Sequence, residues 1–344
     1  MTRPSPPRSG RAATPPVGFA WDDRCLLHDN GPGHPERPQR LIAIRDRLER
    51  GGTLGRLLVI APDPAPIEAL ARVHEAAYVQ AIRRVCERAP VRLDPDTSVS
   101  EGSWEAALLS AGGGLAAVDA VLAGRARAAF VATRPPGHHA ERDVAMGFCL
   151  FNSIAVAARH AQERHGASRV AIVDWDVHHG NGTQHMFEED DTVLYVSTHQ
   201  WPFYPGTGAR GERGRGRGLG FTLNLPLPAG AGDAEYRRVF EAEVIPALER
   251  FRPDLILLSA GFDAHERDPL AGMALTTGGY GRLTGLLRDA AERLCAGRIV
   301  SLLEGGYDLE ALAASVETHL RVLMDEPASK PPSPATGSRR GTRR

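Results

Sequence analysis

Short β-branched runs alternate along the chain with longer Ala- and Leu-rich runs, and this alternation limits the folds that the chain can adopt. The pattern is typical of parallel strands joined by helical crossovers. No internal repeat or linker divides it. We therefore expect an α/β fold, a single-domain α/β/α sandwich around a mostly parallel central sheet. Strands are expected at 128–133, 170–176, 192–197, 254–260 and 298–303, and helices at 103–122, 153–165, 234–250, 280–296 and 309–324.

The two ends of the chain differ in composition from the segment between them. Residues 1–16 and 326–344 are rich in Pro, Ser, Gly and Arg, so they bury too little apolar surface to offset chain entropy. We expect a disordered N-terminal tail over 1–16, a folded domain over 17–325 and a disordered basic C-terminal tail over 326–344.

Charge and cysteine content exclude several classes of protein. The formal net charge is -1, from 41 basic and 42 acidic residues, so we expect no specific nucleic-acid binding. The 4 cysteines include no CxxC pair, which favours a reducing, cytoplasmic setting. Glycine or charge interrupts every apolar run before it reaches the roughly 18 residues that a membrane span needs, so we expect no membrane partner. The oligomeric state stays open.

Polar clusters follow almost every predicted strand. Ligands of open parallel sheets bind beyond the carboxyl ends of the strands, so clusters that are distant in sequence should converge in space. They lie at 134–139, 174–180, 261–263 and 304–307.

The segment 170–178 places three ionisable groups on one face of a predicted strand. The strand period of two sends Asp174, Asp176 and His178 to the same side. Two buried carboxylates beside an imidazole are costly unless a cation compensates them. Asp176 and His178 suit Zn²⁺, Fe²⁺ or Mn²⁺, and Asp263, just after the predicted strand at 254–260, is the natural third ligand. Asp174 is then expected to accept hydrogen bonds from side chains beside the metal site rather than to bind the metal as one of its three ligands.

Two adjacent histidines and a tyrosine complete a catalytic hypothesis. His138 and His139 follow a Pro-Pro-Gly turn, and an imidazole beside a metal site is suited to taking and returning a proton. Asp174 and Asn181 would hold the two imidazoles in their working tautomers. Tyr307 follows two glycines, and its hydroxyl can donate a hydrogen bond to an oxyanion.

The motifs together resemble the histone deacetylase family over 21–323. They are PPGHHA at 135–140, DWDVHHGNG at 174–182, YPGTG at 204–208, SAGFD at 259–263 and EGGY at 304–307. Asn181 and the GPGHPERP segment at 31–38 resemble class II members and their bacterial relatives, which include acetylpolyamine amidohydrolases and acetoin utilization proteins. The resemblance implies the arginase/deacetylase fold and a catalytic domain over 17–325. It also implies zinc-dependent hydrolysis of an acylated lysine in a protein or peptide, or of a related acylated amine.

The resemblance also implies finer roles. Asp176, His178 and Asp263 would be the zinc ligands, with Fe²⁺ as an alternative metal. Gly147 would accept a hydrogen bond from the substrate amide. The substrate tunnel would be lined by Gly147, Phe148, Tyr204 and Leu270, and a structural potassium ion would be held by Asp174, Asp176, His178, Ser197 and Thr198.

Three alternatives remain. An acetylpolyamine amidohydrolase would share the chemistry, although the apolar Leu270 stands where polyamine-selective relatives have an acidic residue. An arginase-like ureohydrolase would need two Mn²⁺ ions and more carboxylates. A protein that binds acyl-lysine without hydrolysing it would not need His138, His139 and Tyr307.

Overall fold

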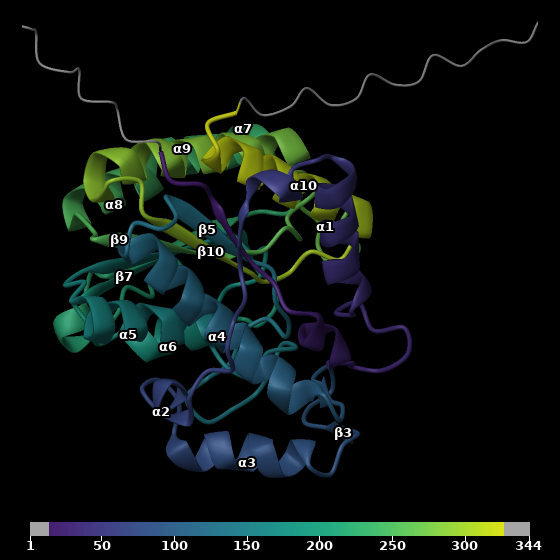
Figure 1. Ribbon diagram of the computed structural model, residues 1–344. Coiled ribbons are helices and arrows are strands. Elements are labelled where there is room, and N and C mark those ends of the chain that lie inside the picture. Colours follow the sequence, from purple (N-terminus) through teal and green to yellow (C-terminus); the bar gives the residue numbers. More distant parts are fainter. Residues whose placement is uncertain (1–13, 327–344) are drawn as a thin grey trace, which may run out of the picture.

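The computed structural model describes residues 14–326 (Figure 1) and contains an eight-stranded sheet. The strand order is β2-β1-β5-β10-β9-β6-β7-β8, and every neighbouring pair is parallel. The sheet is thus wholly parallel where a mostly parallel one was predicted. Its strands are β1 (Gly18–Ala20), β2 (Leu58–Ile60), β5 (Ala128–Val131), β6 (Val170–Asp174), β7 (Val193–Gln200), β8 (Thr222–Leu227), β9 (Leu255–Ala260) and β10 (Ile299–Leu303). The predicted tails lie outside the described residues except for 14–16 and 326.

Helices cover both faces of the sheet, which confirms the predicted α/β/α sandwich (Figure 1). One layer contains α1 (Gln39–Arg50), α7 (Asp233–Val239), α8 (Ile245–Phe251), α9 (Thr277–Cys295) and α10 (Leu309–Leu323). The other contains α2 (Ile67–Leu70), α3 (Ala76–Cys86), α4 (Ser103–Leu122), α5 (Ser153–His165) and α6 (Asn181–Phe187). The remaining elements are a hairpin of β3 (Val91–Arg92) and β4 (Ser98–Val99), the 3₁₀ turns Asp23–Leu27, Leu54–Arg56 and Gly216–Gly218, and a π-helical turn, Phe240–Val244.

Each face of the sheet has its own apolar core. In β6, Ala171 and Val173 pack into the core beneath α9 and α10, whereas Val170 and Ile172 pack into the core beneath α4 and α5. Both faces are therefore dry, which explains why the strands are nearly continuous apolar runs. The polar groups of the site lie at and beyond the carboxyl ends of the strands.

Some elements differ from the prediction for clear physical reasons. The helix expected at 234–250 is two α-helices joined by a π-helical turn, Phe240–Val244, and Pro246 just beyond it has no N–H to continue the ladder. No element was predicted before residue 103. The strands β1 and β2 there have three residues each, too short to show a period.

Helix α4 is long and apolar enough to cross a membrane by length and composition alone, which the sequence analysis did not expect. In the fold, 72% of its most apolar 18-residue window is buried. A Cβ at Gly112 would come within 1.8 Å of the Asp63 carbonyl oxygen, so the glycine permits a close backbone approach. The apolar composition of α4 thus serves core packing.

Candidate active site

The polar clusters meet at the carboxyl ends of β5, β6, β9 and β10, as the parallel sheet predicted. They surround a pocket with a volume of about 210 Å³. Gly147, Phe148, Tyr204 and Leu270 all line it, so the structure brings together the four residues expected in a substrate tunnel. Phe203 also lines the pocket and stacks on the His178 ring, a neighbour that the sequence analysis missed.

Asp176, His178 and Asp263 form one group, of which His178 lines the pocket. Each offers one ligand atom, and these atoms lie within 4.8 Å of one another. The Nδ1 atom of His178 is 3.1 Å from Asp176 Oδ1 and 3.2 Å from Asp263 Oδ2. The backbone N–H of Val177 donates to Asp263 Oδ1, and that of Gly305 donates to Asp176 Oδ2. Backbone amides therefore fix both carboxylates.

The predicted strand geometry around these ligands needs correction. β6 ends at Asp174, so Asp176 and His178 lie on the following loop and not on the strand. The side-chain alternation nevertheless continues, because Trp175 and Val177 are buried in the opposite core. The N–H of Asp176 donates to Asp174 Oδ1 at 3.1 Å, and the chain bends over 176–178.

Glycines allow the backbone to approach the two carboxylates closely. A Cβ at Gly305 would lie 2.0 Å from Asp263 Oδ2, and one at Gly261 would lie 2.1 Å from Asp176 Oδ2. Any side chain at either position would displace a carboxylate. This requirement explains the glycines of the segments 261–263 and 304–307.

The electrostatics of the three groups fit a bound cation. Burial and the charge of Asp176 raise the pKa of Asp263 to about 7. Burial lowers the pKa of His178, but Asp176 and Asp263 outweigh it and raise the pKa to about 10. Two buried carboxylates and an imidazole that opens on a pocket match the donors that Zn²⁺ or Fe²⁺ takes in catalytic sites. The donor set therefore fits the metal that the resemblance implied.

His138 and His139 lie next to each other with different partners. Their ring centroids are 4.0 Å apart. His138 Nδ1 lies 3.0 Å from Asp174 Oδ2; burial lowers the pKa of His138, but Asp174 and Asp176 raise it to about 10. Burial and the charge of His138 hold the pKa of His139 well below its ordinary value.

The neighbours of Asn181 define the tautomer of His139. Asn181 Nδ2 donates to Glu141 Oε1 at 2.6 Å, so the amide oxygen faces His139 Nδ1 at 2.8 Å. That oxygen can only accept, so Nδ1 of His139 carries the hydrogen. The Nε2 lone pair of His139 is then free to accept a proton.

Tyr307 lines the pocket with its ring edge-on to Phe148, at a centroid distance of 6.0 Å. The Tyr307 N–H donates to Asp268 Oδ2 at 2.7 Å. The guanidinium of Arg40 lies over the ring, 4.9 Å from its centroid. Asp268 and Arg40 were not found from the sequence, because neither belongs to a recognisable strand-end cluster.

Glu304 is a further group whose role the sequence analysis missed. Its Oε2 accepts from the N–H groups of Gly137 and His138 at 2.7 and 3.2 Å, so it joins the end of β10 to the histidine loop. Burial raises the pKa of Glu304 to about 7. Its position as the first residue of the cluster at 304–307 was the available signal.

A buried ion-pair network contacts the backbone beside Tyr307. Glu36 Oε2 accepts from Arg134 Nη2 at 2.6 Å, and Glu36 Oε1 accepts from Arg40 Nη1 at 3.1 Å. All three side chains have 0% exposure. Arg40 Nε also donates to the Gly306 carbonyl at 2.7 Å, directly before Tyr307. The segment 31–38 thereby contacts the site through Glu36.

Two of the residues expected to hold potassium, Ser197 and Thr198, lie on β7 beside Asp174. Ser197 pairs with Asp174 in the register of β6 and β7, and Thr198 Oγ1 donates to the Asp174 carbonyl at 3.4 Å. Ser197 Oγ lies 2.9 Å from His199 Nδ1. The structure thus brings Ser197 and Thr198 beside Asp174.

A wholly parallel sheet with an Asp-His-Asp group and paired imidazoles beyond its strand ends has the architecture of the arginase/deacetylase fold. The crystal structure of the HDA15 HD domain is similar to it, with a TM-score of 0.88 and 41% sequence identity, covering 92% of this chain and 90% of that one. Residues 34–323 match the histone deacetylase domain. The chain therefore belongs to the histone deacetylase family.

Two curated relatives illustrate the range of the family. The histone deacetylase-like amidohydrolase of Pseudomonas aeruginosa is 44% identical over 309 residues, covering 85% of this chain and 81% of the relative. The human polyamine deacetylase HDAC10 is 41% identical over 315 residues, covering 88% of this chain but 46% of the human protein. Relatives of this kind are deacetylases and amidohydrolases, which supports hydrolase activity for the chain.

Proposed function

We propose that the protein is a metal-dependent deacetylase that hydrolyses the amide of an acylated lysine or a related acylated amine. One observation carries the proposal: Asp176, His178 and Asp263 lie together, and His178 lines the same pocket as His139 and Tyr307. The three ligands would hold Zn²⁺, with Fe²⁺ as the alternative. When bound, the ion supplies a Lewis acid that polarises the acyl carbonyl and acidifies water.

The two histidines differ in what they can do with a proton. His139 has its hydrogen on Nδ1 and an amide partner, so its Nε2 can take the proton of the attacking water and return it to the leaving amine. His138 has a carboxylate partner, Asp174, which favours its cationic form. A cationic His138 would stabilise the negative charge that develops on the substrate.

The remaining groups orient the substrate. The Tyr307 hydroxyl would donate to the carbonyl oxygen as it becomes an oxyanion. Phe148 and Tyr204 would flank the apolar stem of the substrate, and the Gly147 carbonyl would accept from its amide N–H. A Cβ at Gly147 would lie 2.4 Å from His139 Cδ2, so the backbone can pass this close to the imidazole only at a glycine.

We favour acyl-lysine over acylated polyamine as the substrate class. A human relative is named a polyamine deacetylase, which keeps the second class in consideration. Leu270, however, presents an apolar side chain to the pocket, and a neutral lysine stem suits it better than a second cation. The pocket volume of about 210 Å³ leaves room for one narrow acylated chain.

Two further proposals follow from the same arrangement. Potassium would bind behind the pocket between Asp174 and the strand β7, with Ser197 and Thr198 among its ligands. The setting would be cytoplasmic, because all four cysteines are free and buried and a reducing compartment keeps them so.

A fluorogenic acetyl-lysine peptide and an acetylated polyamine, each assayed with zinc-loaded and iron-loaded protein, test the proposal. We expect hydrolysis of the peptide at the higher kcat/KM. Binding of the peptide without any hydrolysis under either metal would contradict the proposal and favour a non-catalytic acyl-lysine binder.

A further inference from the structure

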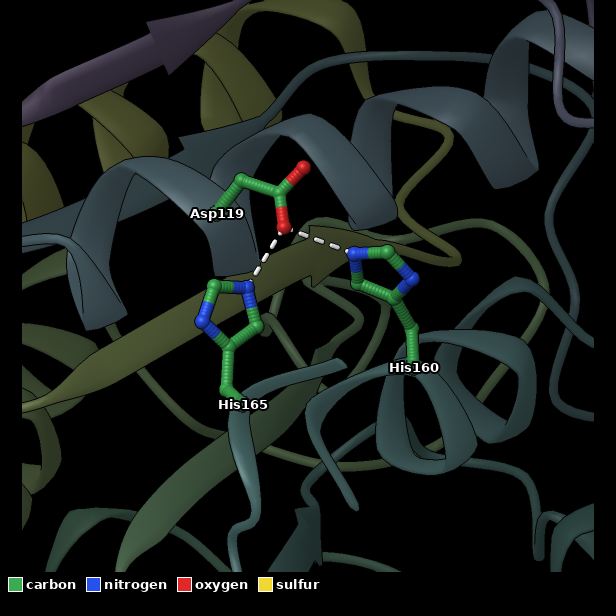
Figure 2. A group of neighbouring side chains, drawn as sticks. All are labelled: Asp119, His160 and His165. Carbon is green, nitrogen blue, oxygen red and sulfur yellow. Dashed lines mark hydrogen bonds and ion pairs between the residues drawn. The ribbon is translucent and has the colours of Figure 1, made fainter. Parts of the chain in front are cut away.

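A second group of possible metal ligands lies outside the pocket, between α4 and α5 (Figure 2). Asp119 belongs to the last turns of α4, whereas His160 and His165 belong to α5. Both imidazoles point at one carboxylate oxygen: Asp119 Oδ1 lies 2.7 Å from His160 Nε2 and 2.6 Å from His165 Nε2. Among residues 14–326, two groups of at least three His, Cys, Asp or Glu residues could hold a metal ion. They are this one and the group of Asp176, His178 and Asp263.

We propose that Asp119, His160 and His165 bind a divalent transition-metal ion that links α4 to α5. One carboxylate and two imidazoles are donors that zinc takes readily, and three protein ligands leave a fourth position for water. The ligand atoms lie within 4.8 Å of one another. Two atoms bound to one tetrahedral zinc lie about 3.3 Å apart. The distance from Asp119 Oδ1 to each imidazole nitrogen would therefore have to increase by roughly 0.6 Å to admit the ion. Small side-chain rotations can supply this increase.

The surroundings of Asp119 leave it available to a cation. Within the described part of the chain, both of its ion-pair partners are imidazoles and no arginine pairs with it. The side chains of Asp119, His165 and His160 are 45%, 24% and 9% exposed, so one side of the cluster is open to solvent and the other is anchored in the fold. His165 is the last residue of α5, and Gly166 beyond it has φ 68, a left-handed conformation that ends the helix.

This site is separate from the catalytic pocket. Helix α5 runs from the pocket side, where its N-cap Asn152 contacts the Ala140 carbonyl, to the far end of the sheet, where β6 begins. β6 has five residues, so its two ends are about 13 Å apart at about 3.3 Å per residue. An ion held at His165 would therefore not reach the reacting atoms. It would instead cross-link two core helices that cover the same face of the sheet.

Metal content of the full-length protein tests the proposal. Protein stripped by a chelator is dialysed against Zn²⁺, and bound metal is measured by mass spectrometry. We expect two equivalents in the wild type and one in both His165→Ala and Asp119→Ala, whose exposed side chains can be removed without opening the core. His185→Ala removes a histidine of 41% side-chain exposure that has one carboxylate partner, and we expect it to keep two equivalents.

A second comparison separates this inference from the proposed function. Asp263→Ala should lose the ion of the pocket and keep one equivalent, and added Zn²⁺ should still raise its melting temperature. Combining it with His165→Ala should abolish both effects. One equivalent in the wild type that His165→Ala retains would overturn the second site and leave the pocket site standing. Two equivalents retained in His165→Ala would also overturn it, since the ion would then lie elsewhere.

Discussion

The Nδ1 atom of His139 lies 2.8 Å from the amide oxygen of Asn181, so this imidazole has an uncharged partner, whereas His138 beside it is paired with Asp174. A carboxylate in place of Asn181 would stabilise the imidazolium of His139. We expect Asn181→Asp to raise the pKa of His139 by roughly 1 unit or more. Because the base must be neutral, the acidic limb of the kcat/KM profile should move to higher pH by the same amount. An unchanged pH profile, at unchanged metal content, would contradict the role of His139 as the base.

Removal of the Tyr307 hydroxyl should slow catalysis without removing metal. We expect Tyr307→Phe to lower kcat by about 10²-fold, because one oxyanion donor is lost. Tyr280→Phe is the matched control, since the Tyr280 hydroxyl is buried and has no hydrogen-bond partner among residues 14–326. Full activity in Tyr307→Phe would refute the donor role.

The buried network below the site should control stability. Burial raises the pKa of Glu36, but Arg134 and Arg40 outweigh it and hold the pKa well below 4.5. We expect Glu36→Gln to cost roughly 3–5 kcal/mol of unfolding free energy at neutral pH, because two buried guanidinium groups lose their counterion. Urea unfolding at pH 7 measures this cost.

The lowered pKa of Glu36 determines how the stability difference between wild type and Glu36→Gln depends on pH. The pKa of this carboxyl group is lower in the folded protein than in the unfolded chain. It therefore stabilises the folded protein fully at a pH above its unfolded pKa. This contribution is lost as the pH falls towards the folded pKa. The gap between wild type and Glu36→Gln should therefore narrow below about pH 4.5. Glu49→Gln breaks an exposed pair with Arg45 at the same i, i+4 spacing and should cost only about 0.5 kcal/mol at any pH. A similar cost for both variants would contradict the buried-network account.

Leu270 should set the preference between the two substrate classes. Leu270→Glu places a carboxylate on the pocket wall, where it would attract the second cation of an acylated polyamine. We expect the ratio of kcat/KM for acetylated polyamine over acetyl-lysine peptide to rise roughly fivefold, the scale of an exposed ion pair. Leu270→Gln is the uncharged control, and an equal change in both variants would contradict an electrostatic cause.

The α/β/α sandwich and most of the pocket could be predicted from the sequence, because both depend on local sequence patterns. Apolar runs buried on both faces predicted a parallel sheet, and parallel strands bring their carboxyl ends to one edge. Asp176, His178 and Asp263 were therefore expected together, and the structure brings them together. The side-chain alternation of β6 correctly predicted that Asp176 and His178 face the same side, although the strand ends at Asp174, before both residues.

Other parts of the site depend on contacts that no local pattern shows. Arg40 reaches Tyr307 across 267 positions of sequence, and Asp268 fixes its backbone from a loop. Asp119 and His160 lie on different helices, and their approach follows from how α4 packs on α5. Such pairs require the three-dimensional packing before they can be found.

The inferred second site also affects how the alternatives are separated. Two bound ions were expected to indicate a ureohydrolase, but an ion between α4 and α5 would give the same count. Metal content should therefore be compared in His165→Ala, where one equivalent supports the deacetylase and two support a binuclear pocket.

Activity under controlled metal loading tests the central claim most directly. The protein is stripped with a chelator, assayed on an acetyl-lysine peptide and assayed again after Zn²⁺ is restored, beside Asp263→Ala treated in the same way. We predict that hydrolysis disappears on stripping and returns with zinc in the wild type alone. Full hydrolysis by stripped protein, or equal recovery in Asp263→Ala, would contradict a catalytic ion held by Asp176, His178 and Asp263.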